Sequence, residues 1–245
     1  MKKIIYLLIF FSSIMSQDFD LRDRGLAPER STLKKQKLNN DRNTPGIIIL
    51  DEKNSILKWK GGLKFGENDH EGTLKIRLGR VAFREEDKNF SRGRIQIDMR
   101  TMICTDLEPA KGERLVGHLR SADFFDVDHF PIANLDIKKS ELIGKTPSGL
   151  YQIRITGDLT IKSIKKPIMF NVEADLDSEI KKATGTIVFN RTDFGIEYRS
   201  EQHLNNPDLF WNKLRSMKEA VKDRVIRDEI EVEFEMLSTA GMLRK

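Results

Sequence analysis

Alternation of apolar and polar residues is the dominant pattern of this chain from residue 46 onward. In RIQIDMR, residues 94–100, the apolar Ile95, Ile97 and Met99 are separated by charged or polar neighbours. Successive side chains of a β-strand point to opposite faces, so the pattern predicts strands with one apolar and one polar face. Strands of this kind assemble into antiparallel sheets. The other apolar sets with this spacing are Leu74, Ile76 and Leu78; Leu135 and Ile137; Ile153 and Ile155; Ile168, Phe170 and Val172; and Ile230, Val232, Phe234 and Met236.

The segments between these predicted strands are short and rich in turn-forming residues, such as GKTPSG and DSEIKKA. Short connections favour pairing between successive strands. When residues 46–65 are counted as one long strand, the chain has about eight strands, which suits an antiparallel up-and-down β-barrel as well as a sandwich. We therefore expect an all-β fold. One amphipathic helix is expected over 207–222, before the last strand, from Pro207 and the spacing of Phe210, Leu214, Met217 and Val221.

The first sixteen residues, MKKIIYLLIFFSSIMS, have the layout of a secretory signal, with two lysines, an apolar run and small residues before Gln17. We expect cleavage after Ser16 and a periplasmic or secreted protein. The apolar run is too short to span a bilayer, and no later segment looks transmembrane, so a soluble mature protein is expected. Residues 17–45 are polar and weakly periodic, typical of a linker or arm, and the compact domain is expected over 46–245.

Charge and cysteine content argue against a nucleic-acid-binding function and against stabilisation by disulfides. The formal charge is +5, and it falls to +3 when Lys2 and Lys3 leave with the signal. Basic residues are interspersed with acidic ones along the chain, so the sequence gives no sign of a nucleic-acid-binding surface. Cys104 is the single cysteine, which excludes an internal disulfide. The apolar core alone must therefore hold the fold together.

Residue types that carry catalysis or hold metals are present without the spacing that they need. His70, His118, His129 and His203 are spread along the chain without an H-x-x-x-H pair. In the run from Asp126 to His129, consecutive side chains would diverge on an extended backbone. The chain also lacks a G-x-S-x-G elbow, a phosphate loop and a dinucleotide fingerprint. We therefore expect no enzymatic activity, no metal site and no cofactor.

The stretch HLRSADFFDVDHFP, residues 118–131, is interpreted as a corner between two strands. Phe124, Phe125 and Phe130 are expected to plug the strand junction. The aspartates between them are typical of turns in which a side chain bonds the nearby backbone.

Four segments together resemble the YceI family in order and spacing. They are KWKGGLKFGENDHEGTLKIRLGRVAF, GHLRSADFFDVDHFP, YQIRITGDLTIKSIKKPIMFNVEADL and GTIVFNRTDFGI, and the resemblance covers roughly residues 46–237. It implies a lipocalin-like antiparallel barrel that binds a polyisoprenoid or a similar long amphiphile, such as a quinone or a fatty amide. The polar arm 17–45 and the helix expected near 207–222 depart from the family pattern.

The expected ligand site is the barrel lumen. A barrel of eight strands can fill its interior with side chains or leave room for one ligand, and the sequence leaves both outcomes open. The lumen candidates are Leu74, Ile76, Ile95, Ile97, Met99, Leu135, Ile137, Ile153, Ile155, Phe170, Val172, Val232 and Phe234. His70 and His118 are rim candidates that could contact a polar headgroup, and Arg191 and Asp193 are expected to form a salt bridge at the barrel end.

An alternative function is a non-catalytic protein-interaction module. In that case the barrel is filled, and the arm 17–45 and the helix 207–222 bind a protein partner. This alternative predicts an exposed apolar patch at Phe210, Trp211 or Leu214. Both functions are compatible with a monomer or a homodimer.

Overall fold

The computed structural model describes residues 45–65, 69–201 and 225–241. The expected signal, almost all of the polar arm and the expected helix 207–222 lie outside the described residues. The described elements are β1 (Gly46–Ile49), β2 (Ile56–Gly62), β3 (Asp69–Arg84), β4 (Asn89–Cys104), α2 (Pro109–Arg120), β5 (Ile132–Lys145), β6 (Tyr151–Ile161), β7 (Ile164–Asp175), β8 (Lys182–Asn190), the 3-10 helix η2 (Arg191–Phe194) and β9 (Glu229–Leu237).

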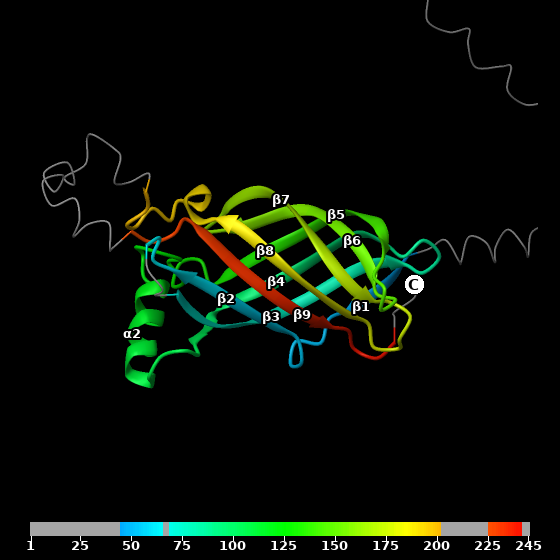
Figure 1. The fold of residues 1–245 in the computed structure, drawn as a ribbon, viewed down its shortest axis with the longest axis horizontal. Coiled ribbons are helices and arrows are strands. Elements are labelled where there is room, and N and C mark those ends of the chain that lie inside the picture. The colour runs from blue at the N-terminus through cyan, green and yellow to red at the C-terminus, as the bar shows by residue number, and fades with distance from the viewer. Residues whose placement is uncertain (1–44, 66–68, 202–224, 242–245) are drawn as a thin grey trace, which may run out of the picture. The chain divides into compact units, whose positions relative to one another are not determined.

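The strands form a closed, antiparallel, up-and-down barrel (Figure 1). Each strand from β2 to β9 pairs with the next along the chain, and β9 pairs back with β2. β1 shares a barrel position with β2, because both pair with β3: Gly46 lies opposite Phe83, and Leu57 lies opposite Leu74. This confirms the expected eight-position barrel. Residues 46–62 supply one of these positions as two separate strands, β1 and β2.

Alternation along the strands places the apolar side chains in the core. In β4, Ile95, Ile97 and Met99 are each at most 9% exposed, whereas Arg94 and Arg100 have well-exposed side chains. Removing such apolar surface from water is the main favourable contribution to folding. The predicted faces therefore match the inward faces for most strands.

β3 departs from strict alternation. Leu78, expected to share the face of Leu74 and Ile76, is only partly buried, while Val81 and Phe83 are buried. The pairing of β3 with β4 shifts register between Ile76 and Leu78, and an extra residue at such a bulge exchanges the two faces of the strand beyond it. The inward face of β3 is thus carried by different residues on the two sides of the bulge.

A helix between β4 and β5 replaces part of the expected strand corner. α2 begins at Pro109, a residue suited to a first helical turn, and lies at one end of the barrel (Figure 1). Val116 is buried, and Leu115 and Leu119 pack against the core. The turn that follows buries Phe124, so the expected apolar plug is present and is preceded by a helix.

Gly72 permits a close contact between the first strands of the barrel. A Cβ atom at this position would overlap the carbonyl oxygen of Ile103 and lie 2.5 Å from the Trp59 ring. With hydrogen in its place, the indole Nε1 of Trp59 donates to the Ile103 carbonyl at 3.1 Å. The glycine therefore fixes the Trp59 ring against the inner wall.

Candidate functional site: an apolar cavity in the barrel

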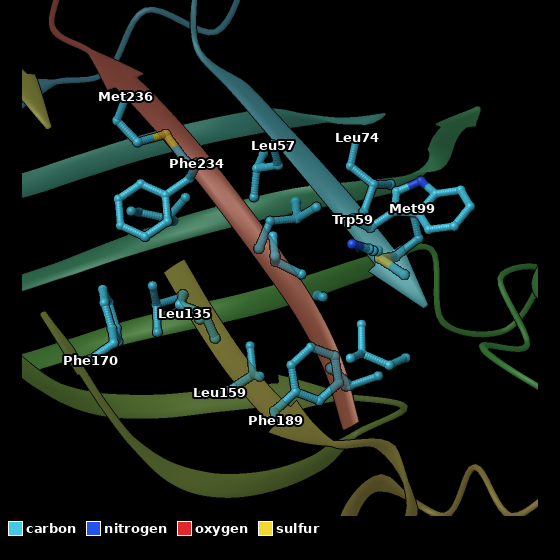
Figure 2. Close-up of a pocket in the computed structure, with 18 of the residues that line it drawn as sticks. Leu57, Trp59, Leu74, Met99, Leu135, Leu159, Phe170, Phe189, Phe234 and Met236 are labelled. Carbon is cyan, nitrogen blue, oxygen red and sulfur yellow. The ribbon is translucent and has the colours of Figure 1, made fainter. Parts of the chain in front are cut away.

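The barrel encloses a cavity of about 500 Å³. Figure 2 shows Leu57, Trp59, Leu135 and Phe234 among the side chains that project into it from strands on different sides of the barrel. Its wall is almost entirely aliphatic and aromatic, and it reaches from α2 to Leu176 and Lys181 near the β7–β8 turn. The volume falls within the range of about 300–1,000 Å³ that small-molecule sites usually have.

Most of the residues expected in the lumen lie on this wall. Those that line it are Leu74, Ile95, Ile97, Met99, Leu135, Ile137, Ile155, Phe170, Val172, Val232 and Phe234. Ile76 and Ile153 point inward but do not line the cavity: they are 4% and 0% exposed, packed among other core side chains. A ligand contact by any of these residues remains a prediction.

Several lining residues were not among the sequence candidates. They include Leu57, Trp59, Phe90, Met102, Leu159, Phe189 and Met236. Leu57 and Trp59 alternate with lysines in the segment ILKWK, a signal of the same kind as that used for the other strands. Phe124 and Phe125, expected only as plugs at a strand junction, also line the cavity.

His118 belongs to an aromatic cluster at the α2 end of the cavity. Its ring centroid lies 4.9 Å from that of Phe124 and 4.8 Å from that of Tyr198, in edge-on arrangements. Such edge-on geometry is the favourable one for aromatic rings. His118 and Phe124 line the cavity, so this cluster forms the part of the wall where an imidazole meets the apolar interior.

His70 also lines the cavity and is held by Asp106. Its Nδ1 lies 2.9 Å from Asp106 Oδ2, while Asp106 Oδ1 accepts from the Glu71 amide and the Cys104 thiol, each at 3.1 Å. Partial burial opposes ionisation, but the hydrogen bonds from His70, Cys104 and Glu71 outweigh it and lower the pKa of Asp106 to about 2.

The pKa of Cys104 shifts in the opposite direction to that of Asp106. Burial, and then its hydrogen bond to the Asp106 carboxylate, raise the pKa of the thiol. A protonated thiol is a poor nucleophile, so this arrangement holds His70 in place without activating the cysteine. Among the described residues, no group of three His, Cys, Asp or Glu side chains is arranged to hold a metal ion.

The expected salt bridge between Arg191 and Asp193 is wrong. Residues 191–194 form the 3-10 helix η2 and not a strand, so the two side chains do not share a strand face. Arg191 is fully buried and pairs with Asp228 at 3.2 Å, while Asp193 is exposed. The guanidinium also donates to the carbonyls of Arg227, Ile196 and Ile226, at 3.0, 2.8 and 3.3 Å.

Arg191 therefore links η2 to the segment that enters β9, and it also contributes to the cavity wall. Burial lowers the pKa of its guanidinium, and the charge of Asp228 opposes that shift. The guanidinium remains protonated at neutral pH, because the ordinary pKa of arginine lies far above that range. Within the part of the chain that the structure describes, Arg191 has a structural role: it is a buried cation that donates hydrogen bonds to backbone carbonyl oxygens.

A family model for the YceI-like domain matches residues 49–237. The chain belongs to the YceI family. Among solved structures, BcnA of Burkholderia cenocepacia matches with a TM-score of 0.56 and 17% identity, over 78% of this chain and 99% of that one. A polyisoprenoid binding domain from Saccharophagus degradans, implicated in plant cell wall breakdown, matches with a TM-score of 0.52 and 12% identity, over 80% and 99%.

These two structures share the fold of this YceI-family barrel. At sequence identities of 17% and 12%, this similarity shows the fold and does not identify a ligand for this chain. No curated protein matches the chain. Within the described residues, none of the helices has the length and apolar content to cross a bilayer.

Proposed function

We propose that this protein is a binding protein and not an enzyme, and that its barrel holds one long, mostly apolar molecule such as a polyisoprenoid, a quinone or a fatty amide. The observation that carries the proposal is the apolar cavity of about 500 Å³ inside the barrel. The Saccharophagus degradans domain, described as polyisoprenoid binding, has the same fold and adds support. The signal-like residues 1–16 support export to the periplasm or the exterior.

An apolar wall is sufficient for useful affinity. Each buried methylene-sized group contributes roughly 0.8 kcal/mol, so a C20 prenyl chain would gain about 16 kcal/mol on transfer from water. Association costs of about 8 kcal/mol, within the usual range, leave about 8 kcal/mol. That corresponds to a Kd near 1 μM. His70 and His118 are the proposed contacts for a polar headgroup, since both reach the wall near α2.

Trp59 provides a direct assay, because it lines the cavity and is one of two tryptophans in the chain. In a Trp211→Phe background, titration with geranylgeraniol should change Trp59 fluorescence and saturate near one ligand per protein. Ala183→Phe places a ring in the cavity from β8 and should weaken binding at least tenfold. Thr186→Phe, on the outward face of the same strand, is the matched control and should change Kd by less than twofold.

Two results would count against the proposal. A folded protein whose Trp59 fluorescence does not respond to geranylgeraniol would leave the cavity without its proposed ligand. Equal affinity in the two phenylalanine variants would place the ligand outside the barrel.

The alternative, a protein-interaction module with a filled barrel, has less support. The interior is not filled by side chains, since about 500 Å³ remains free. The helix and the arm on which that function depends lie outside the described residues.

A further inference from the structure

The strands β7 and β8 pair over only four positions. The paired residues run from Val172 opposite Gly185 to Asp175 opposite Lys182. Toward the α2 end, residues 164–171 of β7 and 186–190 of β8 are not paired with each other, although β7 stays paired with β6 and β8 with β9. We call these two facing edges, 164–171 and 186–190, the seam.

The seam is bounded at both ends. At Gly185 the strands are close, because a Cβ there would lie 2.7 Å from the Asn171 carbonyl oxygen and 2.7 Å from the Phe234 ring. At the other end η2 returns to β7, where the Gly195 Cβ position lies 3.5 Å from Ile164 Cδ1. The unpaired stretch therefore has a defined length in the side of the barrel. Pro167, which has no amide hydrogen, suits a strand with one unpaired side.

The seam lies directly over the cavity. Phe170 on β7, and Ile187 and Phe189 on β8, line the cavity from the two strands that border the seam. Phe189 is only partly buried, although it points inward. Separation of these two edges would therefore lead directly into the apolar interior.

The outer side of the seam exposes large apolar side chains. Met169 on β7 is 64% exposed and Val188 on β8 is 52% exposed, and both have the outward parity of their strands. Single exposed apolar residues are common on protein surfaces, but two on facing unpaired edges that cover an apolar cavity indicate an interaction site.

The β7 side of the seam also carries unpaired positive charge. Lys165 and Lys166 are exposed, Lys162 lies in the preceding turn, and none of the three forms an ion pair with a described residue. The nearest acid on β6, Asp158, is already paired with Lys138 at 2.7 Å. On the β8 side the charge is negative, since Val188 lies opposite Glu231 of β9. The basic, apolar part of the surface is therefore the β7 edge.

We propose that the seam is the side entrance of the cavity, and that the barrel docks there on an anionic lipid bilayer. Met169 and Val188, on the outer face of the seam, enter the headgroup region, the exposed Lys165 and Lys166 contact lipid phosphates, and the ligand chain passes between β7 and β8. This rests on the proposed function, because a long apolar ligand held in a bilayer needs a path into the lumen that avoids water. Each lysine near an anionic surface strengthens membrane association about fivefold.

Closing the seam tests the entrance. In a Cys104→Ser background, Met169→Cys with Val188→Cys places one thiol on each outer edge of the seam, and a short bis-maleimide links them. Cross-linking should slow the transfer of a dansyl-labelled prenyl lipid from phosphatidylglycerol-containing vesicles at least tenfold. The matched control, Thr184→Cys with Glu235→Cys, links β8 to β9 outside the seam, where they are already paired, and should leave the rate unchanged.

Charge reversal tests the docking. Lys165→Glu with Lys166→Glu should slow transfer from anionic vesicles at least tenfold, without changing transfer from phosphatidylcholine vesicles or the Kd for ligand added from ethanol. The control, Lys58→Glu with Lys75→Glu, makes the same change of charge on the outer faces of β2 and β3 and should have little effect on transfer.

The outcomes separate the two proposals. Unchanged transfer rates in both seam variants, with normal ligand affinity, would overturn the side entrance and its bilayer contact while leaving the binding function intact. Failure of the unmodified protein to bind the labelled lipid from ethanol would overturn the binding function itself.

Discussion

Replacing Arg191 with methionine is predicted to destabilise the barrel strongly. The side chain is fully buried, its guanidinium pairs with Asp228, and it donates to three backbone carbonyls. Methionine fills much of the same space but leaves the Asp228 carboxylate and these acceptors without their donor. Breaking one side of a buried charge pair costs roughly 3–5 kcal/mol, and we expect a loss of about that size for Arg191→Met.

Urea unfolding followed by Trp59 fluorescence measures this loss. With an m value of about 2 kcal/mol/M, the midpoint should fall by about 2 M. Arg94→Met is the matched control, because the Arg94–Asp136 pair joins β4 to β5 on the surface and the Arg94 side chain is 60% exposed. It should cost less than about 1 kcal/mol. A loss below about 1 kcal/mol for Arg191→Met would refute the buried link between η2 and the entry to β9.

Two further predictions concern residues near the α2 end. Because the pKa of Asp106 is lowered to about 2, its ionised form stabilises the fold above about pH 4, and that contribution is lost as the pH falls from 4 toward 2. Urea titrations at several pH values should show a smaller loss over this interval in Asp106→Asn; an unchanged loss would contradict the assignment. Gly72→Ala should push the Trp59 ring from the wall, lower the unfolding free energy by about 2 kcal/mol and shift Trp59 emission to longer wavelength. Normal stability and emission would show that the close contact is not needed.

The barrel could be predicted from the sequence because period-two alternation is a local signal that survives in each strand. Ile95, Ile97 and Met99 show it without interruption, and all three line the cavity. On β3 the same rule fails beyond Ile76, because a register shift at a bulge depends on the partner strand and leaves no mark in the alternation itself.

The helix α2 and the ion pair of Arg191 could not be predicted from the sequence, because both depend on tertiary contacts. The helix has two internal glycines and few apolar residues, so its helical period is weak, and its packing on the barrel end decides its structure. Arg191 lies two residues before Asp193 but pairs with Asp228, 37 positions away. Contacts at that separation depend on how β8 and β9 are brought together, which a local pattern does not contain.

The most direct test of the central claim is native mass spectrometry of the mature protein, purified from its own host without detergent and then extracted under denaturing conditions. We expect a bound species of lipid-like mass, at one per barrel, that is released on denaturation and can be replaced by an added prenyl lipid. A bare protein mass, together with refusal of added prenyl lipids by the folded protein, would contradict it.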